Sequence, residues 1–363
     1  MEKKQRLTGI DLFRGIAVYG VVVLHSDGGF TVKPALWELI RQFASFAVPF
    51  FLATSFYLAT DKLYSGSQFK LKPRLIRLLI PYGFWTLFYL LYKAAKYAID
   101  RDYDQLSHLL EDPVSILFFG GAAFHLYFLP LLIIGTITVK GCEFLVHRKV
   151  ALKTLVLFCV LSLIIYELIL KTGNAFELGE NVAFQNFLET FFDQAKDNSI
   201  VRIALVQLSW IIRCLPYIFV AMLLNYPSWK APLNKRLQEK GFTIALLITF
   251  VLIALGGTLI LPESFSEVYL GYSALLLAVS LSKYIPENHL INQSGLYSFG
   301  IYLIHLIVVE ILIILLNRMN PNSTFEGSTL LFLAISIFSF IISWLVTSLL
   351  MKRKSLSRLM FGV

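Results

Sequence analysis

Residues 11–25 read DLFRGIAVYGVVVLH, and this stretch decides the fold class. Ten uncharged, mostly apolar residues lie between Arg14 and His25, whereas a helix needs roughly 20 residues to cross a bilayer. The stretch is therefore either no span or a span that contains ionisable side chains. The chain of 363 residues is 57% hydrophobic and only 15% charged, compared with about 25% charged in soluble domains. This composition predicts an integral membrane protein.

Further apolar stretches of helical length follow the first one. We expect ten spans, at about 8–27, 36–60, 74–98, 122–140, 150–170, 200–225, 241–262, 267–285, 295–317 and 328–351. The expected fold class is thus all-α, a polytopic membrane bundle formed by residues 1–363 as a single domain, and no appended soluble domain is expected. Pro49 is expected to kink the second span. The stretch SILFFGG, 115–121, is too short to span and is expected to be a re-entrant or interfacial piece.

The distribution of basic residues predicts the orientation of the spans. Segments assigned to the inside carry 19 Lys or Arg, and those assigned to the outside carry 5. Because cytoplasmic loops are the Lys/Arg-rich ones, both termini are expected to be cytoplasmic in a multi-pass protein of the plasma (inner) membrane. The acidic stretch IDRDYDQLSHLLEDP, 99–113, then falls outside. The net charge of +9 is read as a topology signal, and nucleic acid is not expected as a partner.

The first span is predicted to carry one polar stripe. Thr8 and Asp11 have the spacing of a capping box, so the helix is expected to begin at Thr8. Arg14 and His25 are eleven residues apart, which places them about 20° from each other around the helix and ~16 Å apart along it. Ordinary alternatives remain open: a helix cap for Asp11, an interfacial anchor for Arg14 and an interfacial histidine for His25.

A basic cluster opens the third span. In KLKPRLIR, Arg74 and Arg77 are one turn apart, and Lys72 comes just before them. Two guanidinium groups at the start of a helix are suited to binding phosphate. The alternative is that the cluster only anchors the helix at the cytoplasmic surface.

Several later spans also contain polar residues. His125 is expected at the same level as His25, and the residues expected to bind substrate are Glu38, Arg41, Arg213 and His305. Ionisable side chains inside spans are candidates for function, although hydrogen-bonded structural histidines are the alternative for His125 and His305. The sequence has no glycine-rich nucleotide loop, hydrolase elbow or metal-spaced cluster, so no metal cofactor is expected.

Taken together, these motifs resemble those of the acyltransferase-3 family of integral-membrane acyltransferases. The resemblance covers nearly the whole chain and rests on Arg14 with His25, on PRLIR with Arg74 and Arg77, on FHLYFLP with His125, and on SFGIYLIH with His305. It implies transfer of an acyl group, expected to be acetyl, from cytosolic acyl-CoA to a hydroxyl of a glycan or similar acceptor across the lipid bilayer.

The resemblance also implies roles for individual residues. The catalytic residues would be His25, Arg14 and His125, with His25 either the general base or a transient nucleophile. Acyl-CoA would be bound by Arg14, Arg74, Arg77 and Lys72. One departure is Ser55-Phe56, where the family usually has Ser-Gly, which puts close helix packing there in doubt.

Two other classes of function fit part of the sequence. A transporter or flippase for a polar or glycan substrate also has polar helix faces, but it does not need a cluster that holds CoA phosphates. A structural or sensory subunit leaves the charges inside the spans unexplained. The acyl group, the acceptor, the oligomeric state and the acid that orients His25 remain open at this stage.

Overall fold

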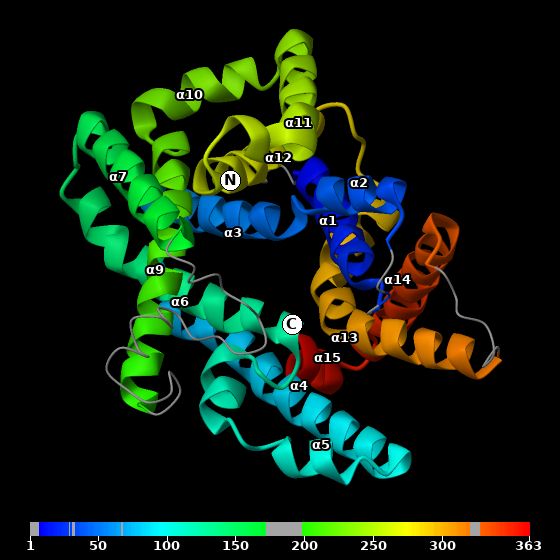
Figure 1. Cartoon of the computed structure of the whole chain (residues 1–363). Coiled ribbons are helices and arrows are strands. Elements are labelled where there is room, and N and C mark those ends of the chain that lie inside the picture. Colours follow the sequence, from blue (N-terminus) through cyan, green and yellow to red (C-terminus); the bar gives the residue numbers. More distant parts are fainter. Residues whose placement is uncertain (1–6, 29, 31–32, 67, 172–197, 320–326) are drawn as a thin grey trace. The chain divides into compact units, whose positions relative to one another are not determined.

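The computed structural model describes residues 7–28, 30, 33–66, 68–171, 198–319 and 327–363 (Figure 1). These residues form helices and connecting turns, with no strand among them. Ten helical segments are long and apolar enough to cross a membrane, which confirms the predicted number of spans. The chain divides into two compact units, Met1–Ser55 with Pro227–Lys354 (unit 1) and Phe56–Tyr226 with Ser355–Val363 (unit 2), and each is described by itself.

Unit 1 is built around the first helix. Its elements are α1 (Thr8–His25), α2 (Ala35–Ala44), the first part of α3 (Ala47–Tyr64), α10 (Pro227–Arg236), α11 (Lys240–Ile260), α12 (Glu263–Leu281), α13 (His289–Met319) and α14 (Thr329–Met351). Helix α1 packs against α2, α12, α13 and α14. It is therefore the central helix of this unit, and Figure 1 shows α13 beside it.

The predicted second span is interrupted, as expected from Pro49. Helix α2 ends at Ala44 and α3 begins at Ala47, so the break lies near Ser45. A proline ring clashes with the carbonyl group four residues earlier, and that residue is Ser45. Pro49 itself lies in the first turn of α3, where its missing N–H leaves no helical hydrogen bond unmade.

The start of α1 corrects one prediction. The helix does begin at Thr8, but Thr8 does not cap it, because the hydroxyl group is not bonded to the first turn. Instead, the Thr8 Oγ1 donates to the carbonyl oxygen of Ile285 at 2.9 Å. Sequence spacing could not reveal this, because the acceptor follows the end of α12, 277 residues away.

Unit 2 contains the remaining helices. They are the second part of α3, α4 (Leu71–Asp100), α5 (Tyr103–His108), the π-helical turn η1 (Ser115–Phe119), the 3-10 turn η2 (Phe124–Tyr127), α6 (Phe128–His147), α7 (Leu152–Lys171), α9 (Ser199–Leu224) and α15 (Lys354–Phe361). Helix α6 packs against α4 and α9, and α7 packs against α9. The stretch expected to be a re-entrant or interfacial piece is thus a short helical turn, η1, followed by Gly120 with a φ of 81°.

Phe56, the residue that departs from the family pattern, packs tightly all the same. Its side chain is buried, and its ring lies so close to Gly135 on α6 that a Cβ added at Gly135 would overlap it. The small residue at this contact therefore lies on the opposite helix. Close packing is kept within unit 2, with the large side chain on α3 and the glycine on α6.

The segment that contains α15 folds back onto α4. The Trp85 Nε1 donates to the Met360 carbonyl oxygen at 2.9 Å, and the Arg77 Nε donates to the Gly362 carbonyl oxygen at 3.0 Å. Gly362 has a φ of 70°, a left-handed conformation that favours glycine. The arrangement fixes residues 360–362 against the face of α4 that carries Arg77.

Candidate functional site

Two close approaches lock α1 against α13. A Cβ added at Gly15 would lie 2.7 Å from the Cβ of Ser294, and one added at Gly295 would overlap the carboxylate of Asp11. The Ser294 hydroxyl also donates to the backbone carbonyl of Asp11 at 3.1 Å. The two helices therefore approach with almost no side-chain layer between them, as membrane helices do where small residues meet.

The register of these contacts shows that α1 and α13 run parallel. Asp11 meets Gly295 near the start of both helices, and His25 meets His305 further along both. Parallel directions are what alternation requires of the first and ninth of ten spans. The parallel directions thus agree with the predicted count between these helices in being odd, while the side on which the termini lie remains a prediction.

The imidazole rings of His25 and His305 stack on each other. Their centroids are 5.4 Å apart and the ring planes differ by 30°. His305 is fully buried, and its Nδ1 lies 2.6 Å from the Tyr302 carbonyl oxygen. Since a carbonyl oxygen only accepts, Nδ1 is assigned the proton. Two residues 280 positions apart, both predicted as site residues, thus meet in unit 1.

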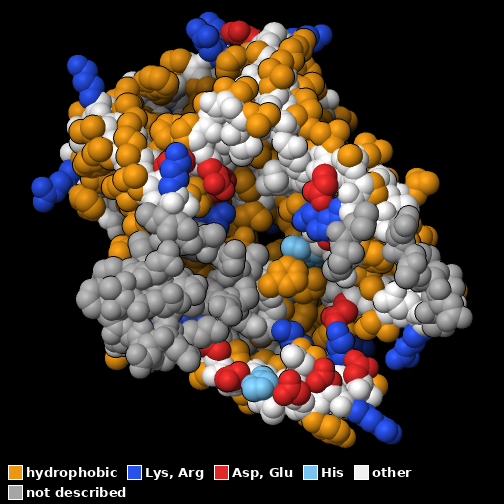
Figure 2. All heavy atoms as spheres, in the orientation of Figure 1, with side chains coloured by type: hydrophobic (Ala, Val, Ile, Leu, Met, Phe, Trp, Pro, Cys, Tyr) orange, Lys and Arg blue, Asp and Glu red, His pale blue; other side chains and the backbone are white. Residues whose placement is uncertain are grey.

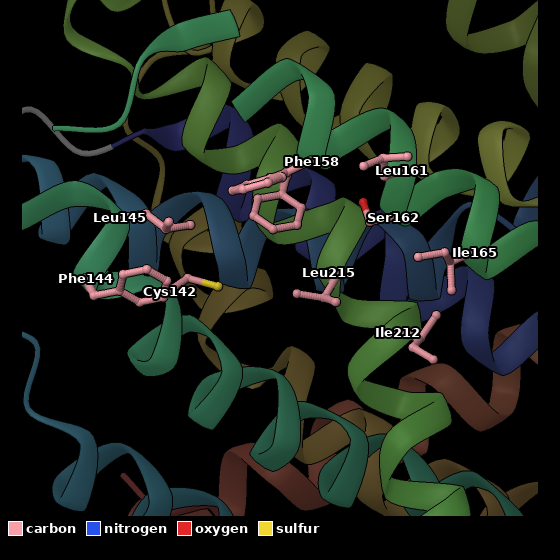
Figure 3. A pocket seen from close by; sticks show the side chains of 10 residues that line it. Cys142, Phe144, Leu145, Phe158, Leu161, Ser162, Ile165, Ile212 and Leu215 are labelled. Atoms are coloured by element: carbon pink, nitrogen blue, oxygen red, sulfur yellow. The ribbon is translucent and has the colours of Figure 1, made fainter. Parts of the chain in front are cut away.

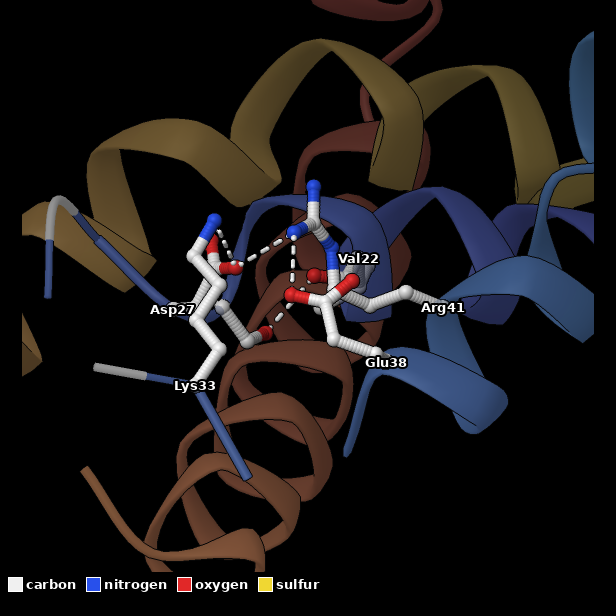
Figure 4. A network of polar contacts seen from close by, with 6 residues as sticks. Val22, Asp27, Lys33, Glu38 and Arg41 are labelled. Atoms are coloured by element: carbon white, nitrogen blue, oxygen red, sulfur yellow. Dashed lines mark hydrogen bonds and ion pairs between the residues drawn. The ribbon is translucent and has the colours of Figure 1, made fainter. Parts of the chain in front are cut away.

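An ionic network follows directly after His25 in the chain (Figure 4). The buried carboxylate of Asp27 pairs with Lys33 at 2.9 Å and with Arg41 at 3.0 Å. Arg41 also lies 3.4 Å from the carboxylate of Glu38. Arg41 and Glu38, both predicted to bind substrate, are therefore brought together, and Asp27 and Lys33 are partners that the sequence analysis did not name.

His125 lies in unit 2, in the 3-10 turn before α6. Its side chain is buried, and its ring meets that of Tyr89 on α4 with centroids 5.0 Å apart and planes at 73°. The preceding turn is held by Tyr82, whose hydroxyl accepts from the Gly120 N–H and donates to the Ile116 carbonyl oxygen, both at 3.0 Å. Two tyrosines of α4 thus position His125 and the turn that leads to it.

The predicted phosphate cluster opens α4, also in unit 2. The guanidinium group of Arg74 lies over the ring of Phe69, 4.2 Å from its centroid. Arg77 is exposed and uses its Nε to hold Gly362. Lys72 is exposed as well. Within the described ranges of the chain, none of these three cations has a carboxylate partner.

The remaining predicted site residues lie in separate units. Arg14 is half-buried on α1, one turn after Asp11, in unit 1. Arg213 is half-buried near the middle of α9, in unit 2. Each has an interaction partner. The structure thus brings His25 to His305 within unit 1 and Arg74 to Arg77 and Lys72 within unit 2.

Unit 2 contains a buried ion pair between Arg202 and Asp112 that was not predicted from the sequence. Arg202 is 2% exposed and makes two parallel hydrogen bonds to the carboxylate of Asp112, at 2.9 and 2.8 Å. Its guanidinium group also lies over the ring of Phe119. The available signal was an arginine in the first turn of a span, which requires a partner. The partner could not be identified, because Asp112 lies 90 residues away in a loop.

A cavity of about 310 Å³ in unit 2 is not a site for polar chemistry (Figure 3). Helices α6, α7 and α9 line it with apolar side chains that include Phe144, Phe158 and Leu215. Its one hydroxyl, that of Ser162, donates to the Cys159 carbonyl oxygen within α7. This cavity therefore offers an apolar ligand contact area but no group for acyl transfer.

Side chains that could hold a metal ion do not cluster among the described residues. No group of three or more histidine, cysteine, aspartate or glutamate side chains is placed there to hold a metal ion. The cysteines Cys142, Cys159 and Cys214 are all buried and unbridged.

The fold and the site describe a polytopic helical membrane protein with a histidine pair inside the helices of unit 1. Comparison with known families gives a match to the acyltransferase domain of the acyltransferase-3 family over residues 7–348. The chain therefore belongs to the acyltransferase-3 family, as its motifs indicated.

Two curated relatives from Enterococcus faecalis are each named an amino-acid racemase. One is 24% identical over 352 residues, which is 97% of this chain and 47% of the relative. The other is 29% identical over 136 residues, which is 37% of this chain and 18% of the relative. The chain thus spans about half the length, or less, of the curated relatives it matches. No solved structure matches the chain.

Proposed function

We propose that this protein is a membrane O-acyltransferase with His25 as its general base. It moves an acyl group, expected to be acetyl, from cytosolic acyl-CoA to a hydroxyl of an extracytoplasmic glycan or similar acceptor. The observation that carries the proposal is the stacked pair of His25 and His305, at the end of the α1 face that begins with Arg14. Family membership supports the reaction class.

The chemistry assigned to His25 is proton removal from the acceptor. An alcohol is a poor nucleophile until its proton is taken, and histidine is the side chain suited to this near neutral pH. As the acceptor oxygen forms the new ester bond, the thioester C–S bond breaks and the proton passes by way of His25 to the CoA thiolate. His305, held by the Tyr302 carbonyl, supports the His25 ring in a fixed orientation.

The donor is proposed to bind at Arg74, Arg77 and Lys72 of unit 2, and Arg14 of unit 1 remains a predicted CoA-binding residue. Planar guanidinium groups make paired hydrogen bonds to phosphate oxygens. The ring of Phe69 supports the guanidinium group of Arg74 from one side. A cation that already has a carboxylate partner would have to lose that partner before it could bind phosphate. Arg74, Arg77 and Lys72 have no carboxylate partner in the described part of unit 2.

The remaining predicted residues are assigned to the acceptor side. His125, held by Tyr89, is proposed to contact the acceptor or the thioester oxygen. Glu38, Arg41, Arg213 and His305 are proposed to bind the acceptor. We propose that the protein is a multi-pass protein of the plasma membrane with cytoplasmic termini, and the ten apolar helical segments among its described residues and its charge distribution support this.

The experiment that tests the proposal is mass analysis of surface glycans from cells with and without the protein. The proposal expects the mass of an acyl group, expected to be acetyl, to disappear with the protein and to return with the wild-type gene but not with His25→Ala. Glycans that keep every acyl group while their surface amount falls would indicate the alternative, a transporter or flippase.

A further inference from the structure

A second cavity in unit 2 is polar and open to the surface. It has a volume of about 260 Å³ and lies between α4, α5 and η1. Its polar lining includes Lys93, Tyr97, Gln105, His108, Glu111 and Ser115. The size is just below the roughly 300–1,000 Å³ of pockets for drug-sized ligands. It is suited to one small polar molecule or one ring of a longer one.

One wall of this cavity is fixed in place by the buried ion pair. Asp112, which lines the cavity, is held by both terminal nitrogens of Arg202 and accepts from the Ser115 backbone N–H at 3.0 Å. Arg202 is 2% exposed, so the carboxylate is anchored from the interior of the unit. A site pre-formed in this way loses little entropy when a ligand binds.

The hydroxyl group of Ser115 itself points to a ligand. Ser115 is 4% exposed, and its Oγ has no hydrogen-bond partner among the residues that the structure describes. Gly121 makes room for this hydroxyl, since a Cβ at that position would overlap it. A buried polar group left without a partner carries a desolvation cost that no hydrogen bond offsets. A ligand in the cavity that exchanges hydrogen bonds with Ser115 would recover that cost.

The cavity shares helix α4 with the ring contact that holds His125, although His125 itself does not line it. On α4, Tyr89 contacts His125, and Lys93 and Tyr97, which follow at intervals of four residues, line the cavity. Residues four apart lie on one face of a helix. From the other side, Gly121 lines the cavity four residues before His125. The cavity and the His125 contact are thus connected by one face of α4 and by a short stretch of chain.

The chemistry of the lining is that of a hydroxyl-rich ligand. Carboxylates accept from hydroxyl groups, an amide both donates and accepts, and the serine hydroxyl does both. The aromatic face of Tyr97 offers apolar contact area beside these groups. Figure 2 shows acidic side chains gathered over α5, which fits a neutral ligand better than an anionic one.

We propose that this cavity binds one sugar ring of the acceptor glycan, with Ser115, Glu111 and Asp112 as its hydrogen-bonding residues. The inference rests on the proposed function, which supplies the glycan as the acceptor. It adds the place in unit 2 where that acceptor is selected.

The test is sugar binding by the full-length protein in detergent, measured by saturation-transfer NMR. The probes are the methyl glycosides of glucose, galactose, rhamnose and N-acetylglucosamine, with cyclohexanol as a ring of similar size that lacks the hydroxyl array. At least one glycoside should bind in preference to cyclohexanol. Ser115→Ala should weaken it about tenfold or more, while thermal stability stays the same or rises because an unpartnered polar group is removed.

The matched control is Ser162→Ala, which removes a buried hydroxyl from the apolar cavity of the same unit. It should leave glycoside binding unchanged. Binding that survives Ser115→Ala and Glu111→Gln unaltered overturns the inference, as does the absence of binding by all four glycosides. Glycoside binding without any acyl transfer keeps the sugar site and removes only the proposed function.

Discussion

The rings of His25 and His305 stack with centroids 5.4 Å apart, although they belong to the first and ninth of ten candidate spans. The contact depends on the close approach of α1 to α13 at Gly15 and Gly295. A larger residue at either glycine would separate the helices. The stacking of the two histidines thus depends on Gly15 and Gly295, which lie 10 positions before them on each helix and let the helices approach closely.

The first prediction concerns Asp27, whose side chain is 10% exposed and pairs with two cations. Asp27→Asn should lower the free energy of unfolding by about 2 kcal/mol, because hydrogen bonds to charged groups contribute about 1.5–3 kcal/mol and the Asp27 carboxylate pairs with both Lys33 and Arg41. Thermal unfolding in detergent would measure this. The control is Glu38→Gln, which removes the other, 51% exposed partner of Arg41 and should cost less than about 1 kcal/mol. Equal losses in the two variants would contradict the account.

The second prediction concerns the contact of Phe56 with Gly135. Gly135→Ala should destabilise the protein by about 1–3 kcal/mol, since the new methyl group overlaps the Phe56 ring. Gly141→Ala on the same helix meets nothing within 4 Å and should be neutral or slightly stabilising. In the Phe56→Leu background, the cost of Gly135→Ala should fall. If it stays the same in that background, the two residues do not form the proposed complementary pair.

The sequence predicted the spans well because each has helical length and an apolar majority. It also predicted the break near Pro49, which follows from the chemistry of one residue. It failed at Thr8, whose hydroxyl group bonds to Ile285 instead of capping its own helix. Local spacing describes what a helix does with itself, whereas this bond depends on which helix end packs beside it.

In the candidate site, too, features within one helix were predictable from the sequence and contacts between helices were not. Spacing placed Arg14 and His25 on one face of one helix, and α1 is indeed a single uninterrupted helix. The partner of His25 and the pairing of Asp112 with Arg202 involve separate helices. No periodicity links residues so far apart in the chain, and only the packed structure shows that they meet.

The third prediction concerns Arg77 and the donor. Arg77→Ala should weaken CoA binding about 10- to 100-fold, because hydrogen bonds to charged groups contribute about 1.5–3 kcal/mol. Arg77→Lys should also weaken it, since lysine lacks the planar fork that fits phosphate. Calorimetry on the purified protein would measure both. Lys153→Ala, at an exposed cation of α7 in the same unit, is the control. Unchanged CoA affinity in Arg77→Ala would remove this residue from the donor site.

The fourth prediction is the orientation of the chain. Single cysteines introduced by Glu2→Cys and Val363→Cys should react with an impermeant thiol reagent only after the cells are opened. The three native cysteines are buried, which keeps the background low. A cysteine introduced into the acidic stretch, Asp104→Cys, should react in intact cells. Labelling of either terminal cysteine in intact cells would show that the orientation is wrong.

The central claim, that His25 is the base for acyl transfer, is tested most directly by labelled acyl-CoA in membrane vesicles that contain the acceptor. Wild type, His25→Ala and His125→Ala are compared at equal expression, with CoA affinity measured in parallel. His25→Ala should lower transfer by the 10²- to 10⁴-fold that a positioned base contributes and should leave CoA affinity largely intact. Near-normal turnover in His25→Ala, with transfer lost in His125→Ala, would contradict the claim and assign the base to His125.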